Sequence, residues 1–270
     1  MFSNVRIPGV LQRIGIAYFF VSILYLKTKP NTQIFVALVL LIRYWMLMSL
    51  VNVPRIDPAN FDRGTNLAAW IDGISLPNHL YIETKTWDSE GILSTLPAIA
   101  TGIIGILIGY LLNMNVPKIE ITKKMVLYGI VMTIVGFAWG FLFPINKSIW
   151  TSSYVLYTAG LGTLCLSVLY YIIEIASLKK WTKLFLIWGV NPMIVFFFSG
   201  IIPRILSMIL VKNPENTTED INLQNYMYKF WIVPNFENPM NASLAGALIY
   251  VLIWSFILWI FYRNRLIFKV

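Results

Sequence analysis

Seven long apolar runs, each close to the length needed to cross a lipid bilayer, constrain this chain more than any other feature. A helix needs ~20 apolar residues to span the hydrocarbon core, and each run carries few or no charges. Hydrophobic residues make up 58% of the chain and charged residues 12%, whereas soluble domains have about half and a quarter. The sequence therefore predicts an all-α, polytopic integral membrane bundle of about seven transmembrane helices. The runs are 7–26, 33–53, 91–113, 125–143, 151–174, 184–210 and 244–262.

The sixth run is interrupted by helix-breaking residues. It contains Asn191 followed by Pro192, and Gly200 and Pro203 further on. A proline removes a backbone donor and clashes with the preceding turn, so we expect a kink or break in this run. Asn191 is a candidate binding residue there, because its side chain could reach a neighbouring helix or satisfy carbonyls freed by the proline.

Basic and acidic residues alternate between the connections that join the runs. Lys and Arg cluster in four connections, whereas every acid except Glu120 and Glu174 lies in the segments 54–90 and 211–243. The positive-inside rule assigns the basic connections to the cytoplasm. Seven crossings then place the N-terminus outside and the C-terminus in the cytoplasm, with residues 1–270 as a single transmembrane domain and 54–90 and 211–243 as its outer loops. The basic connections are 27–33, 114–124, 175–183 and 263–270.

Two arginines near the start of the chain conflict with that orientation. Arg6 and Arg13 lie at the beginning of the first run, and by the same rule they should hold the N-terminus inside. Additional helices upstream in the natural protein would remove the conflict. The charge pattern therefore indicates that the chain is a fragment or begins at an internal start.

Glycines recur at helical spacing in the third and fourth runs. Small residues about four apart allow helices to approach closely in lipid, so the pattern predicts tight helix packing. The glycines are Gly102, Gly105 and Gly109 in the third run, and Gly129, Gly136 and Gly140 in the fourth.

The long outer loop 54–90 carries the first candidate site residues. Asp88 and Glu90 stand just before the third run, where acids commonly cap free amides and complement the helix dipole. The functional alternative is that a carboxylate here binds a cationic or hydroxylated ligand, or orients a base. His79 has a pKa suited to general-base chemistry, although a single loop histidine is more often a hydrogen-bonded surface residue. It is a weak candidate for a catalytic residue.

The short outer turn between the fourth and fifth runs carries a second group. Asn146 and Lys147 could donate hydrogen bonds to a sugar, and Trp150 could stack against its ring. The alternative is a simple turn followed by an interfacial tryptophan anchor.

Charged side chains inside the runs are costly and usually face a cavity or a partner. Gln12 and Arg13 lie in the first run, and Arg43 lies near the middle of the second. Snorkelling to the interface accounts for Arg13 more easily than for Arg43.

Composition excludes two other classes of protein. The net charge of +9 could suggest nucleic-acid binding, but the basic residues sit in short clusters between apolar runs. One histidine and one cysteine cannot form a metal cluster. Neither a nucleic-acid partner nor a metal is therefore expected.

The chain resembles the heparan-α-glucosaminide N-acetyltransferase family and its bacterial relatives of the DUF5009 type. The resemblance extends over essentially the whole chain, and several short segments carry it together. These segments are Arg-Ile-Pro-Gly-Val-Leu-Gln-Arg-Ile-Gly at 6–15, His79-Leu80-Tyr81, Asp88-Ser89-Glu90-Gly91-Ile92-Leu93-Ser94-Thr95-Leu96-Pro97, 144–151, Gly189-Val190-Asn191-Pro192, and Tyr262-Arg263 with Phe268-Lys269.

This resemblance implies a membrane acetyltransferase, or a portion of one, that moves an acetyl group from cytoplasmic acetyl-coenzyme A to an amino sugar on the outer side. Asp88, Glu90, Asn146, Lys147, Trp150 and Asn191 would bind the acceptor, and Gln12 and Arg13 would bind the donor. A positive inner face would favour the anionic coenzyme.

The sequence departs from the family pattern at two places. Ser89 stands where relatives typically have proline. Family members also have several helices before the Arg-Ile-Pro-Gly segment, including a region with the histidine thought to be catalytic, and His79 matches a different position. We therefore expect acetyl transfer to require an N-terminal region. Transfer by residues 1–270 alone, abolished by His79→Ala, would refute this.

Two other functions remain open at this point. One is a transporter of amino sugars or muropeptide fragments that uses the same outer residues without chemistry. The other is a non-catalytic membrane subunit, acting beside a missing N-terminal region or as a homo-oligomer. In each case the expected location is the cytoplasmic (inner) membrane of a bacterium.

Overall fold

The structure, a computed structural model, describes residues 5–54, 56, 58–81, 83–84, 86–215 and 219–268. Arg55, Lys85 and Lys269, which contributed to the predicted orientation, lie outside the described residues. The chain divides into two compact units, Met1–Ser177 and Leu178–Val270, and each is described by itself.

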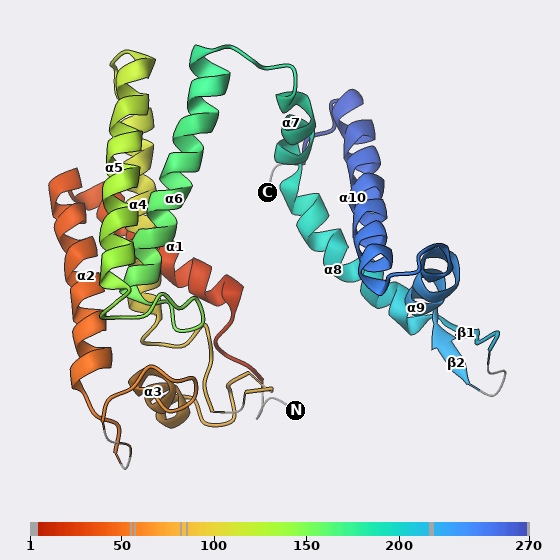
Figure 1. Cartoon of the computed structure of the whole chain (residues 1–270), viewed down its shortest axis with the longest axis horizontal. Helices are drawn as coiled ribbons and strands as arrows, with labels where there is room; N and C mark the ends of the chain where they lie inside the picture. Colours follow the sequence, from red (N-terminus) through yellow and green to blue (C-terminus); the bar gives the residue numbers. More distant parts are fainter. Residues whose placement is uncertain are drawn as a thin grey trace. The chain divides into compact units, whose positions relative to one another are not determined.

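The first unit is built from long apolar helices, several of which run alongside one another (Figure 1). Its short helix, α3, lies within the long outer loop, and a π-helical turn, Tyr171–Ile175, continues the last helix. The helices are α1 (Val10–Lys27), α2 (Pro30–Leu50), α3 (Leu67–Ser75), α4 (Thr95–Leu112), α5 (Lys118–Trp139) and α6 (Ser152–Tyr170).

The second unit contains a broken helix pair, a small hairpin and one long helix. Helices α7 (Thr182–Val190) and α8 (Pro192–Met208) are bent by 71° at Asn191. Strands β1 (Leu210–Lys212) and β2 (Asp220–Asn222) pair antiparallel. The remaining elements are α9 (Leu223–Met227), a π-helical turn at Tyr228–Ile232, a 3-10 turn at Val233–Asn235 and α10 (Pro239–Arg263).

Local sequence explains where several of these helices begin. Pro30, Pro192 and Pro239 each occupy a first-turn position, where the missing N–H is not needed. The side chain of Asn238 accepts a hydrogen bond from the backbone N–H of Met240 and caps α10.

The predicted membrane architecture is confirmed. Within the described residues, six helices are long and apolar enough to cross a bilayer, and the bent pair α7–α8 makes a seventh if it counts as one span. The expected break falls at Asn191-Pro192, and α8 then continues through Gly200 and Pro203. The chain is an integral membrane protein. The sequence did not predict α3, which lies inside the connection 54–90, or the hairpin β1–β2 and α9, which start at the last residue of the sixth run and continue into the connection 211–243.

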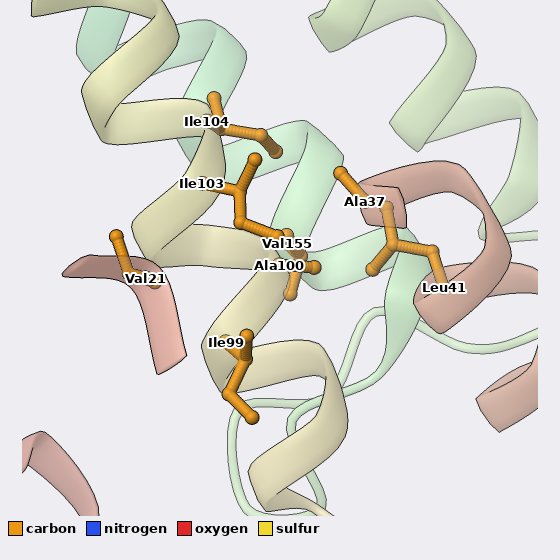
Figure 2. Packing of buried hydrophobic residues seen from close by; sticks show 8 residues of the cluster. All are labelled: Val21, Ala37, Leu41, Ile99, Ala100, Ile103, Ile104 and Val155. Carbon is orange, nitrogen blue, oxygen red and sulfur yellow. The ribbon is translucent and has the colours of Figure 1, made fainter. Parts of the chain in front are cut away.

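Helix α4 forms the centre of the first unit. It contributes four of the eight residues in the main buried cluster and stands between α1, α2 and α6 (Figure 2). Because α4 is surrounded on several sides, its loop-side end is held by the neighbouring helices, and this fixes the position of the candidate site. The cluster is Val21, Ala37, Leu41, Ile99, Ala100, Ile103, Ile104 and Val155.

The beginnings of α1, α4 and α6 meet at one end of the first unit. Arg13 of α1 contacts Ser94 at the start of α4, and Trp150, just before α6, donates a hydrogen bond to Thr101 of α4. Tyr44, near the end of α2, donates to the carbonyl of Ile149 at the same place. We refer to this as the outer end, following the orientation that the charges predict.

Candidate functional site at the outer end

An arginine that precedes the first helix binds both acids of the loop before α4. The Nε and Nη2 atoms of Arg6 donate to the two carboxylate oxygens of Asp88 at 2.9 and 2.6 Å. The same Nη2 lies 2.8 Å from Oε2 of Glu90. The Asp88 side chain is completely buried, whereas those of Glu90 and Arg6 are 15% and 31% exposed. The hydrogen bond to Asp88 raises the pKa of Arg6, so this arginine remains charged.

The second arginine, Arg13, lies in the first turn of α1 and is 6% exposed. Its terminal nitrogens donate to the carbonyls of Ser89 at 2.9 Å and Ser94 at 2.6 Å. The guanidinium stacks 4.5 Å from the ring centre of Trp150. Arg13 therefore faces protein carbonyls and an aromatic ring rather than lipid, which accounts for a charge inside the first apolar run.

A third acid, Asp72 of α3, is buried directly behind the loop. Its Oδ1 accepts the backbone N–H of Ile92 at 2.9 Å, and its Oδ2 is buried with no hydrogen-bond partner in the described part of the chain. A β-carbon on Gly91 would lie 1.9 Å from that Oδ2. Glycine is therefore required at position 91 for Asp72 to hold the loop. We define the outer cluster as Arg6, Arg13, Asp72, Asp88 and Glu90.

Burial raises the pKa of Asp72 to about 6, and the Ile92 hydrogen bond opposes this increase only in part. Since the pKa is higher in the folded than in the unfolded state (~3.9), the charged carboxylate opposes folding. This penalty is absent below pH ~4, grows between about 4 and 6 and is complete above 6, where a shift of ~2 pH units corresponds to ~3 kcal/mol.

Asp72→Asn is therefore expected to raise thermal stability in detergent at pH 8 and to leave it nearly unchanged at pH 4. Asparagine retains an oxygen for the Ile92 N–H but carries no charge. Melting followed by tryptophan fluorescence at the two pH values measures the difference. The exposed Asp62 of the same loop provides a matched control as Asp62→Asn. An equal change in melting temperature at pH 4 and pH 8 for Asp72→Asn would contradict a charge penalty at this position.

The turn before α6 positions Trp150. Its backbone is in the left-handed region, with φ of 52°, a strained conformation for a large residue. Hydrogen bonds hold the turn: the Asn146 side chain accepts the N–H of Ser148, and Asn146 and Thr151 exchange two further bonds. This strained conformation occurs at the residue whose ring contacts Arg13.

His79 anchors the segment that carries Arg6. Its Nδ1 lies 2.7 Å from the carbonyl of Val5, and its own carbonyl accepts the N–H of Ile7. Because a carbonyl can only accept, Nδ1 is the donor in the contact with Val5. The described contacts give His79 a structural role, and its catalytic role stays a prediction.

The other predicted site residues are spread more widely. Gln12, the chain neighbour of Arg13, and Lys147, in the turn before α6, are both exposed. Asn191 belongs to the second unit, where its amide binds the backbone of Leu266 and Phe268. Arg43 is exposed on α2 and makes no hydrogen bond or ion pair with any residue that the structure describes. The donor role of Gln12 and Arg13 and the acceptor roles of Lys147 and Asn191 remain predictions.

Two members of the outer cluster, Arg6 and Asp72, are not among the site residues that the sequence predicts. In the sequence Arg6 is a topology signal and the first residue of the 6–15 motif, whereas in the structure it binds Asp88 and Glu90 and its guanidinium lies 4.7 Å from the ring centre of Tyr81. Asp72 lay unnoticed in the loop. The one available signal was an acid within a short apolar stretch, Leu67–Ser75, which is amphipathic when wound as a helix.

The fold and the outer cluster define a class of protein: a polytopic helical membrane protein with buried, paired charges at its outer end. No family model matches the chain. Among curated proteins, heparan-alpha-glucosaminide N-acetyltransferase from Mus musculus and from Homo sapiens are each 25% identical to it over an alignment 319 positions long, which covers 99% of this chain. The chain is therefore distantly similar to these two N-acetyltransferases, in agreement with the resemblance that its motifs carry.

The chain spans under half the length of these two relatives, 45% of the mouse protein and 44% of the human one. The alignment runs through both units of the chain. All five residues of the outer cluster therefore lie inside the aligned part of the chain.

Proposed function

We propose that this chain forms the acceptor-binding outer face of a membrane acetyltransferase that transfers acetyl from acetyl-coenzyme A to an amino sugar, in a bacterial inner membrane. The relatives' name supports both the acetyl group and the amino-sugar acceptor. In such a reaction the amine nitrogen forms a bond to the acetyl carbonyl carbon, the carbon–sulfur bond breaks, and the coenzyme leaves as a thiol that takes up the proton lost by the amine.

One observation carries the proposal: Glu90 keeps a carboxylate oxygen for a ligand. Both oxygens of Asp88 bind Arg6, and Oε2 of Glu90 accepts from Arg6 and from the Ser89 hydroxyl. Oε1 of Glu90 has no hydrogen bond to any described residue, and this side chain is partly exposed. A carboxylate held rigidly by an arginine, with one oxygen open, suits the ammonium group of an amino sugar.

The surroundings of Glu90 support recognition of the rest of a sugar ring. Tyr81 is exposed beside Arg6, and Trp150 is half-buried with Arg13 stacked on its ring. Aromatic rings beside hydrogen-bonding groups are common in small-molecule sites. Since Arg13 stacks on the Trp150 ring, sugar stacking on Trp150 would use the opposite face.

The proposal predicts that Glu90→Gln weakens binding of glucosamine to purified protein in detergent by roughly tenfold or more, because a charge-assisted hydrogen bond is worth about 1.5–3 kcal/mol. N-acetylglucosamine lacks the ammonium group, so it should bind the wild type more weakly than glucosamine does. The Glu90→Gln substitution should leave its affinity unchanged. Isothermal titration calorimetry with both sugars measures this.

Asp62→Asn, which removes an exposed acid elsewhere in the same outer loop, is the matched control and should bind like the wild type. Equal affinity of the wild type for the two sugars, or unchanged binding by Glu90→Gln, would overturn the proposed acceptor site. Release of free thiol from acetyl-coenzyme A in the presence of glucosamine tests the transfer step separately. Binding without thiol release would favour a transporter or a binding subunit.

A further inference from the structure

Two arginines line an open pocket at the end of α10, at the membrane face that the charge distribution assigns to the cytoplasm. The pocket has a volume of about 430 Å³ and is formed by Val190, Tyr262, Arg263, Arg265 and Ile267. This volume lies within the range of small-molecule sites, about 300–1,000 Å³. Arg263 also lies 5.4 Å from the ring centre of Trp259.

No acidic residue neutralises this pair among the residues that the structure describes. Neither Arg263 nor Arg265 has a side-chain hydrogen bond or ion pair there, apart from the contact of Arg263 with Trp259. The described acids of the second unit all lie in the connection 211–243, which joins the opposite ends of α8 and α10. The pocket therefore presents two exposed positive charges with no acidic partner among the described residues, and this favours binding of an anion.

An apolar groove starts beside the pocket and runs between α8 and α10. It has a volume of about 390 Å³. The groove and the pocket share the segment 261–268: Phe261 and Phe268 line the groove, with ring centres 5.9 Å apart, and their chain neighbours Tyr262 and Ile267 line the pocket. The groove is formed by Ile194, Phe198, Ile202, Trp254, Ile257, Phe261 and Phe268.

The segment that links pocket and groove is held in place by the break between α7 and α8. The Asn191 side chain is fully buried, donates to the carbonyl of Leu266 at 2.9 Å and accepts the N–H of Phe268 at 2.9 Å. Arg265 adopts a left-handed backbone with φ of 54°, which is unfavourable for a residue with a β-carbon. Asn191 therefore fixes a strained turn that brings Arg265 to the pocket, so the site is preorganised.

We propose that this site binds an anionic phospholipid of the inner leaflet, with the headgroup phosphate between Arg263 and Arg265 and an acyl chain in the groove between α8 and α10. Basic pockets between transmembrane helices on the cytoplasmic side recognise lipid headgroups in this way. An adjacent apolar groove and cationic pocket match an amphiphile better than a soluble anion, which would leave the groove unused. The inference is independent of the acetyltransferase proposal.

Native mass spectrometry of the purified chain with added lipids tests the site. The wild type should retain phosphatidylglycerol in preference to phosphatidylcholine with the same acyl chains. Arg263→Gln and Arg265→Asn should each reduce this retention roughly fivefold, which corresponds to ~1 kcal/mol per basic residue. Asparagine is chosen at position 265 because it tolerates the left-handed backbone. Ile202→Trp, which fills the groove without changing charge, should also reduce retention.

The matched control is Lys180→Gln, which removes an exposed basic residue of the same unit and the same predicted membrane face but outside the pocket. It should retain phosphatidylglycerol like the wild type. Size-exclusion profiles and melting curves identify any variant that fails to fold, and the two arginine variants are independent of each other.

Equal retention of the two lipids by the wild type, or equal losses in Lys180→Gln and the arginine variants, would overturn the proposal. Displacement of the lipid by micromolar coenzyme A, with no effect of Ile202→Trp, would overturn the lipid assignment in favour of a soluble phosphate ligand.

Discussion

Arg6→Gln is expected to destabilise the protein by about 3 kcal/mol or more and to abolish ligand binding at the outer cluster. The variant leaves the Asp88 carboxylate, whose side chain is completely buried, without its charged partner. Removing one member of a buried ion pair costs roughly 3–5 kcal/mol because the remaining charge stays desolvated. The partial exposure of Arg6 places the expected value at the lower end. Melting temperatures in detergent and glucosamine titration measure the two effects.

The double variant Arg6→Gln with Asp88→Asn tests whether the stability lost in Arg6→Gln comes from the unpaired charge of Asp88. It replaces the ion pair by two neutral amides, so most of the stability lost in Arg6→Gln should return. Arg63→Gln provides the control, since Arg63 is exposed and its described contact is a weak one with Trp87, 5.9 Å from the ring centre. Strictly additive losses in the double variant would show that Arg6 and Asp88 are not coupled.

The helices that cross the membrane could be predicted from the sequence because lipid requires long apolar runs. The boundaries were less accurate for a physical reason. The fourth run, 125–143, was expected to begin after the basic stretch Lys118–Lys124, yet α5 begins at Lys118. A helix can extend into the polar interface, where Lys and Glu side chains are solvated, so hydropathy alone does not mark its first turn.

The candidate site could be predicted only in part. Asp88 and Glu90 were found because they stand immediately before a helix, where acids have a recognisable meaning. Arg6 lies 82 residues from Asp88, and no local pattern indicates that the two residues meet. Asp72 is likewise brought to Ile92 by the packing of α3. Contacts across such distances are set by tertiary structure, which periodicity and composition do not encode.

The glycine pattern predicted close helix packing without identifying the partner helices, and the structure assigns part of it to α5 and α6. A β-carbon on Gly136 of α5 would lie 2.3 Å from the backbone nitrogen of Tyr157, and one on Gly160 of α6 would lie 2.4 Å from that of Thr133. By contrast, Gly105 has open space around it. The two backbones therefore approach so closely that only glycine fits at these crossings.

Gly160→Ala is therefore expected to destabilise the first unit by about 3 kcal/mol, the upper end of the range for overpacking. The atoms in the way are the Thr133 hydroxyl and two backbone atoms, the nitrogen of Thr133 and the carbonyl oxygen of Gly129. Rotating the Thr133 side chain would leave both backbone clashes, so the helices must separate. Unfolding in a graded series of detergent and denaturant, monitored by circular dichroism, measures the loss.

Gly162→Ala in the same helix is the matched control, because a β-carbon there would meet nothing within 4 Å. Alanine is a better helix former than glycine by up to ~1 kcal/mol, so this variant should be as stable as the wild type or slightly more so. A loss of stability in Gly160→Ala without a loss in Gly162→Ala would be attributed to the α5–α6 contact, because helix propensity changes in the same direction in both variants. Equal effects of Gly160→Ala and Gly162→Ala would mean that α5 and α6 do not pack at this distance in the membrane.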